Sequence, residues 1–85
     1  MSDDYVTRAT LLPFEIEMVD GSKFKNVGDV EVYLRQLNDD QHLSSHWGIA
    51  VRMFANAMHD PAYLKAATMS FQTALALEGL LVRMH

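Results

Sequence analysis

The fold is decided by the stretch Phe14-Glu15-Ile16-Glu17-Met18-Val19-Asp20-Gly21-Ser22-Lys23-Phe24-Lys25-Asn26-Val27. Apolar and charged residues alternate on both sides of its Asp-Gly pair, which is the strongest short-range signal of a β-hairpin. The chain after this stretch has the periodicity of helices. The sequence therefore predicts a mixed fold, with a hairpin followed by helices.

The charges on the two arms favour one register of this hairpin. A two-residue turn would place Glu17 opposite Phe24, and this would put a charge on the apolar face. A three-residue loop avoids that, because Gly21 then occupies the left-handed position of a type I turn with a G1 bulge. The cross-strand pairs predicted by this loop are Ile16–Phe24, Glu17–Lys23 and Glu15–Lys25. The side chains predicted to face inward are Phe14, Ile16, Met18 and Phe24.

Two helices are predicted directly after the hairpin. Gly28 can act as the N-cap of the first, whose apolar residues recur at i, i+3, i+4 and i+7 until the helix ends near Asn38. Ser44 or Ser45 can cap the second helix. This second helix is apolar around much of its girth, so we expect it to be the central helix of the domain.

A third helix and a short strand complete the expected fold. Asp60 as N-cap and Pro61 at the first helical position form a strong start signal. The apolar periodicity continues to about Leu77, and Gly79 fits a C-terminal cap. The β-prone residues 80–84 could then return as a third strand, because a lone two-stranded hairpin is marginal in water.

The length of 85 residues fits one domain. We expect a single α+β domain over residues 13–85, with the helices packed on one face of a small antiparallel sheet. Residues 1–12 are expected to form an N-terminal arm or a short strand.

Charge and composition argue against several classes of partner and location. The formal charge is −4 and the seven basic residues are scattered, so we expect no nucleic-acid binding. No apolar run approaches the ~18 residues of a membrane span. The chain has no cysteine, and its acidic start is unlike a signal peptide, so the expected location is the cytoplasm.

The sequence near the C-terminus carries a family resemblance. It reads Ala67-Thr68-Met69-Ser70-Phe71-Gln72-Thr73-Ala74-Leu75-Ala76-Leu77-Glu78-Gly79-Leu80. This segment resembles the closing helix of a small uncharacterised proteobacterial family, domain-of-unknown-function family nine-eight-two. The opening hairpin with its glycine turn, followed by Val27 and a capped helix, is similar too. The resemblance spans roughly residues 13–83; it implies the α+β fold and a bacterial source, but no known activity and no functional residue.

His42 and His46 are the candidates for a metal or small-molecule site. Histidines four residues apart on a helix share a face and can hold a metal ion. The alternative interpretation is a solvated helix start, and no Glu follows in a His-Glu-x-x-His arrangement. We therefore predict no metal and no cofactor, and a metal-binding or small-molecule-binding domain using His42 and His46 is the alternative function.

No catalytic residue is predicted. Ser44 and Ser45 lie near histidines and aspartates, but no Gly-x-Ser-x-Gly elbow is present, and serines before a helix are usually caps. Glu15 and Glu17 share one face of a strand, where the opposing lysines neutralise them. The sequence therefore indicates that the protein is not an enzyme.

Trp47, Ile49 and Met53 are the predicted interaction residues. The spacing of Trp47 also fits a core stripe, whereas Ile49 and Met53 lie on a flank of the second helix. Met and aromatic side chains are over-used at interfaces. We therefore expect a protein-interaction or accessory module, either a homodimer or a partner of another protein, that buries this flank or extends its sheet edge.

Overall fold

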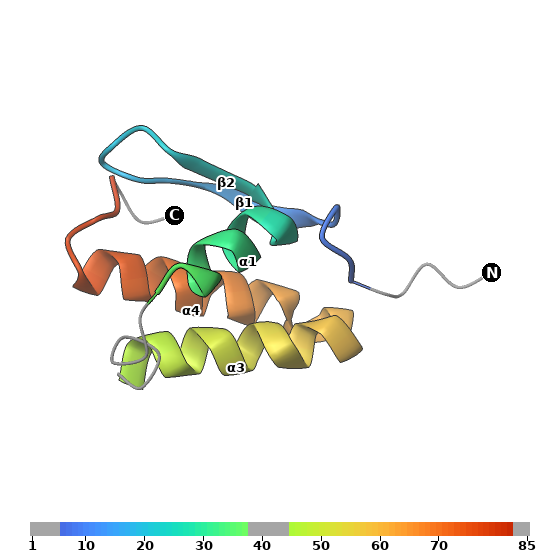
Figure 1. Ribbon diagram of the computed structural model, residues 1–85. Helices are drawn as coiled ribbons and strands as arrows, with labels where there is room; N and C mark the ends of the chain where they lie inside the picture. Colours follow the sequence, from blue (N-terminus) through green and yellow to red (C-terminus); the bar gives the residue numbers. More distant parts are fainter. Residues whose placement is uncertain (1–5, 38–44, 83–85) are drawn as a thin grey trace.

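The computed structural model describes residues 6–37 and 45–82. The elements in chain order are β1 (Leu11–Glu17), β2 (Lys23–Asn26), α1 (Val27–Arg35), α3 (Ser45–His59), the 3-10 turn η1 (Pro61–Tyr63) and α4 (Leu64–Leu77). The two strands form an antiparallel hairpin. Helices α1 and α4 lie against one side of this hairpin, and α3 packs on the far side of α4 (Figure 1). This is the predicted α+β fold, with the helices on one side of a small sheet.

The register near the turn is the predicted one. The paired residues are Ile16–Phe24, Glu17–Lys23 and, beyond a bulge, Leu11–Asn26. Because of that bulge the ion pair of Glu15 is diagonal, with 3.9 Å between Oε1 and Nζ of Lys23, in place of the predicted pair with Lys25. Such an exposed pair contributes little to stability.

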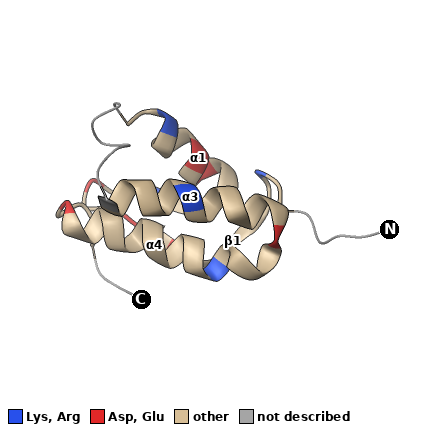
Figure 2. Cartoon of the chain, turned by 90° about the horizontal axis from the view of Figure 1, so that it is seen from below, with Lys and Arg blue, Asp and Glu red and all other residues tan. Residues whose placement is uncertain are grey.

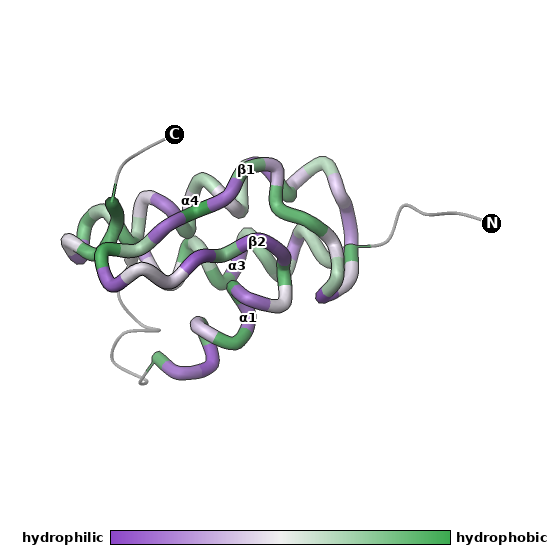
Figure 3. Tube along the Cα trace, turned by 90° about the horizontal axis from the view of Figure 1, so that it is seen from above, coloured by the Kyte–Doolittle hydropathy of each residue, from purple (hydrophilic) through white to green (hydrophobic). Residues whose placement is uncertain are grey.

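The hairpin turn is the predicted three-residue loop. The Gly21 N–H donates to the Met18 carbonyl at 2.9 Å, and the Met18 N–H donates to the Ser22 carbonyl at 2.8 Å. Gly21 has φ +92°, which only glycine adopts readily. The backbone and hydroxyl of Ser22 hydrogen-bond Asp20 and lower the pKa of its carboxyl group. Hydropathy alternates along the strands in Figure 3, with Ile16 buried on the inner face.

The predicted third strand is reduced to a single bridge between Met18 and Leu81. Its two flanking hydrogen bonds run from the Val19 N–H to the Leu80 carbonyl (2.8 Å) and from the Val82 N–H to the Glu17 carbonyl (3.1 Å). Gly79, with φ +74°, ends α4 as predicted, and the Leu80 N–H returns to the Leu75 carbonyl. Because Gly79 and Leu80 belong to this helix cap, few of the described residues remain for strand pairing. Residues 83 and 84, the end of the predicted strand, lie outside the described residues.

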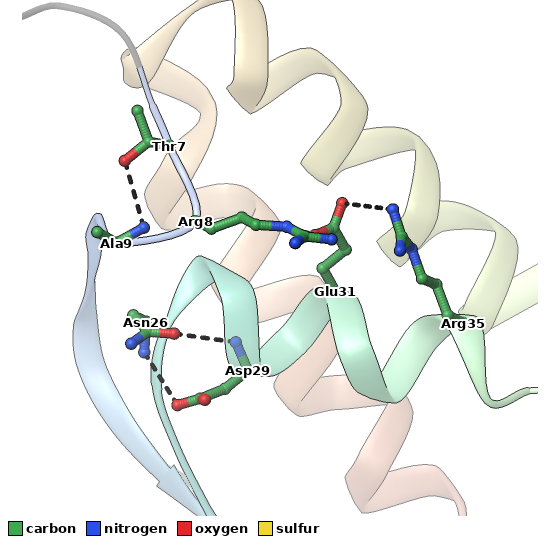
Figure 4. A network of polar contacts seen from close by, with 7 residues as sticks. All are labelled: Thr7, Arg8, Ala9, Asn26, Asp29, Glu31 and Arg35. Atoms are coloured by element: carbon green, nitrogen blue, oxygen red, sulfur yellow. Dashed lines mark hydrogen bonds and ion pairs between the residues drawn. The ribbon is translucent and has the colours of Figure 1, made fainter.

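Helix α1 begins earlier than predicted, and its N-cap is Asn26. The Asn26 Oδ1 accepts the Asp29 N–H at 2.9 Å, and the Asp29 carboxylate accepts the Asn26 N–H at 3.4 Å (Figure 4). This pair is a capping box. Gly28, the predicted cap, allows a close approach instead: its N–H donates to the Arg8 carbonyl at 2.8 Å, and an added Cβ would lie 3.1 Å from that oxygen.

The cap gives a first testable prediction. Asn26→Ala should lower the free energy of unfolding by about 1 kcal/mol, because the Asp29 N–H loses its acceptor. Asn26→Ser keeps a side-chain acceptor at the cap, so its free energy of unfolding should fall clearly less than that of Asn26→Ala. Urea denaturation followed by circular dichroism measures both values. Equal losses in the two variants would show that the side-chain cap is unimportant.

The central helix is α4, and the expectation that residues 45–59 would be central is wrong. Helix α4 contacts β1 on one side and α3 on the other. Its buried residues are Ala67, Thr68, Phe71, Gln72, Ala74 and Leu75. The Phe71 ring is central in an aromatic cluster, with centroids 4.9 Å from Phe24, 5.7 Å from Tyr33, 6.0 Å from Trp47 and 6.3 Å from Phe54. These rings join β2, α1 and α3 to α4.

Residues 6–12 also pack on the core. Val6 and Leu12 are buried, and the Thr10 carbonyl accepts the Val27 N–H at 2.9 Å. Strand β1 begins at Leu11, two residues before Pro13. Among the described residues, no helix has the length and apolar character needed to cross a membrane.

Candidate functional site

The helices α3 and α4 are almost free of charge, including the sides that they expose to solvent. Helices α3 and α4 have 15 and 14 residues, and within them Arg52 and Lys65 are the only Lys, Arg, Asp or Glu residues. Figure 2, which views the molecule from the side of these helices, shows them almost entirely in the colour of uncharged residues. Surface helices of globular proteins usually place charged residues toward solvent. The two helices therefore present an atypical surface.

Large apolar side chains are exposed on these two helices. Ile49 is 50 % exposed, Met69 49 % and Leu77 65 %. They line an open groove of about 380 Å³, which we call the α3–α4 groove, together with His46, Ser70 and Thr73. The groove thus combines an apolar centre with the polar side chains of His46, Ser70 and Thr73.

The structure separates the three predicted interaction residues. Ile49 lies in the α3–α4 groove, and Met53, one turn further along α3, is partly buried against the core. Trp47 is only 1 % exposed, and its ring lies 5.8 Å from that of Tyr33. Trp47 is therefore a core residue that anchors α3, and its side chain offers no surface to a partner.

Leu77 is a groove residue that sequence reasoning missed, and Met69 is one that it considered by residue type alone. The periodic stripe of α4 is defined by residues such as Phe71 and Leu75, which are fully buried. Met69 and Leu77 lie off this stripe: Leu77 was predicted to end the apolar periodicity, and Met69 was predicted to be a core residue or, as a methionine, part of an adaptable partner surface. The available signal was the absence of any acidic residue from Leu64–Leu77.

His46 lies at one end of the α3–α4 groove and binds Glu78. Its Nε2 lies 2.9 Å from Oε2 of Glu78, and its ring centroid lies 5.7 Å from that of Trp47. The contact ties the start of α3 to the end of α4. His42 lies outside the described residues, so the predicted pair of histidines is not placed. Within residues 6–37 and 45–82, no three His, Cys, Asp or Glu side chains are grouped so that they could hold a metal ion.

A second groove lies on the opposite flank of α3, between α3 and α1. It has a volume of about 280 Å³, and we call it the α1–α3 groove. Its lining is Val27, Val30, Glu31, Leu34, Arg35, Val51, Phe54, Ala55 and Met58. The residues from α1 are mostly buried, whereas Val51 and Met58 on α3 are exposed.

Tyr33 is a titratable group with a shifted pKa, and it lies outside both grooves. Burial raises the pKa of its phenol, and the negative charges of Glu78 and Asp20 add to the effect. Its ring contributes packing to the aromatic cluster around Phe71.

No family model matches the chain, and no curated protein or solved structure is significantly similar to it. The resemblance of residues 13–83 to family nine-eight-two stays a prediction. The two grooves and the residues that line them are therefore the features of the molecule that bear on its function.

Proposed function

We propose that this chain is a small cytoplasmic protein-interaction module whose α3–α4 groove is covered by a partner protein. The observation that carries the proposal is the near absence of charge from the exposed sides of α3 and α4, on which Ile49, Met69 and Leu77 lie. The centres of protein interfaces are depleted of charged residues and enriched in Met. Apolar patches of this kind on a surface mark interaction sites.

The chemistry of the groove favours a protein over a lipid or nucleic-acid surface. Helices that lie on membranes carry a polar face rich in Lys and Arg, and nucleic-acid sites need a basic patch. Helices α3 and α4 contain one Lys or Arg residue each, Arg52 and Lys65, and so do not form a basic face of this kind. His46, Ser70 and Thr73 can hydrogen-bond a partner at the rim, as in typical interfaces.

The substitution Ile49→Asp tests the proposal. A carboxylate in the centre of the buried contact should cost about 2 kcal/mol or more, equivalent to roughly a 30-fold loss of affinity. Folding should be nearly unchanged, because Ile49 is half exposed. Affinity capture from the lysate of the source cell, with quantitative mass spectrometry, should show a stoichiometric partner that Ile49→Asp loses.

A matched control comes from α1. Val32 is 53 % exposed and lies outside both grooves, so Val32→Asp should retain the partner. Circular dichroism of both variants checks that each is folded. If folded Ile49→Asp recovers every partner as efficiently as the wild-type chain, the α3–α4 groove is not the interaction site.

A further inference from the structure

We infer that Met69 is a reversible oxidation site that regulates the α3–α4 groove: a peroxide converts its thioether to a sulfoxide, and the oxidised chain no longer takes up its partner protein. The inference concerns regulation of the groove described above, and it rests on the proposed function. The oxidation step can be measured on the purified chain alone, so it is open to test without a partner.

Met69 is the most exposed of the methionines that the structure describes. It is 49 % exposed, compared with 39 % for Met58 and 6 % for Met18, and Met53 is partly buried against the core. Oxidation of a methionine requires that the oxidant reaches its sulfur, so reactivity follows exposure. We therefore expect Met69 and Met58 to react with a peroxide before Met18 and Met53.

No thiol in the chain competes for the oxidant. The sequence contains no cysteine, so the thioethers of methionine are its only sulfur groups. A lone pair on the Met69 sulfur attacks one oxygen of hydrogen peroxide, and the O–O bond breaks. The departing hydroxide takes the proton of the transferred oxygen and leaves as water. The sulfur is oxidised and the peroxide is reduced, and methionine sulfoxide reductases can reverse the change.

The position of Met69 makes the effect of its oxidation local. It shares the α3–α4 groove with Ile49 and Leu77, whereas Phe71, which packs α4 on the core, is fully buried. In the free chain the sulfoxide oxygen stays hydrated, so the packing of α4 should not change. When a partner covers the groove, the same oxygen must lose its water beside apolar side chains, which is unfavourable. Oxidation should therefore weaken binding without unfolding the chain.

The sulfoxide forms while the α3–α4 groove is open. A bound partner covers Met69 and shields its sulfur, so the peroxide acts on the free chain. Oxidation therefore prevents the complex from forming and does not dissolve a complex that already exists. Met58 lies in the α1–α3 groove, so its oxidation should leave binding in the α3–α4 groove unchanged.

The test compares the wild-type chain with Met69→Leu and Met58→Leu. Leucine is apolar and close to methionine in volume, but it cannot form a sulfoxide. Each purified chain is treated with hydrogen peroxide, catalase destroys the excess, and peptide mass spectrometry gives the sulfoxide fraction at each methionine. Each chain then serves at a series of concentrations to capture, from source-cell lysate, the protein that Ile49→Asp loses. Treatment should lower the affinity at least about tenfold for the wild type and Met58→Leu, and should leave Met69→Leu unchanged.

Reversal and folding provide the controls. The two methionine sulfoxide reductases, one for each epimer, should restore capture, and circular dichroism should show that the oxidised chain is folded. Complete oxidation of Met69 without loss of capture, or an equal loss in Met69→Leu, would overturn the inference and leave the proposed function intact. Oxidation of Met18 and Met53 as fast as Met69 would also overturn it. A wild-type chain that captures no partner before treatment would overturn the proposed function and this inference together.

Discussion

Replacing Phe71 with alanine should lower the free energy of unfolding by about 3–5 kcal/mol. Phe71 is fully buried, and its ring packs against those of Phe24, Tyr33, Trp47 and Phe54. The cavity would open where α4 meets the hairpin, α1 and α3 together. Because small domains have only about 5–15 kcal/mol of stability, Phe71→Ala should remove a large share of the free energy of unfolding and shift the urea midpoint strongly downward.

Urea denaturation followed by far-ultraviolet circular dichroism measures this loss. Met69→Ala is a matched control on the same helix, because Met69 is half exposed and should change stability by no more than about 0.5 kcal/mol. A Phe71→Ala loss as small as that of the control would contradict the central position of α4.

Trp47→Ala is expected to cost a similar amount, about 3–5 kcal/mol, because Trp47 is a core residue. Trp47→Phe should cost less, about 1–2 kcal/mol, within the range of ordinary core substitutions. The indole N–H of Trp47 has no acceptor among the described residues, so phenylalanine removes volume but breaks no hydrogen bond within that part of the chain.

Thermal and urea denaturation of both Trp47 variants distinguish a core role from a surface role. If Trp47 is a core residue, its substitution lowers the free energy of unfolding of the protein, and any loss of partner binding follows from that unfolding. If Trp47→Ala keeps wild-type stability and only loses its partner, Trp47 is a surface contact and the packing described for α3 is wrong.

The hairpin could be predicted well because the residues that determine its register are close together in the sequence. Opposite charges on facing positions and a glycine at the left-handed position select one register, and the structure has it: Ile16 lies opposite Phe24, and Gly21 closes the loop. The bulge between Leu11 and Ile16 could not be predicted, since it depends on how residues 6–12 pack against α1.

The identity of the central helix could not be read from hydrophobicity alone. The apolar girth of residues 45–59 led to the expectation of a central helix, but part of this girth, such as Ile49 and Met58, is exposed. Core faces and interaction faces use the same types of apolar residue. The total number of apolar residues in a helix therefore cannot show which face is buried in the core and which contacts a partner. Two boundaries also differ from the prediction. Asn26 was missed as the N-cap of α1 because it is also the last residue of β2. The length of the third strand was overestimated because the helix cap at Gly79 engages the Leu80 N–H.

The candidate site was predicted in part. The flank containing Ile49 and Met53 was identified, and Ile49 does lie in the α3–α4 groove. Its second wall, Met69 and Leu77, depends on the way α4 packs beside α3 and has no periodic signature of its own. Three-dimensional packing was therefore needed to join the two helices into one surface.

The most direct test of the α3–α4 groove as an interaction face is the oxidation rate of Met69 by hydroxyl radicals, compared between dilute purified protein and living source cells. Met69 is half exposed in the free chain, and Tyr63, also exposed but outside both grooves, serves as the internal reference. We predict that Met69 is oxidised readily in the purified protein and is protected several-fold in cells, while Tyr63 reacts equally in both. Equal oxidation of Met69 in the two settings would show that no partner covers the α3–α4 groove in cells.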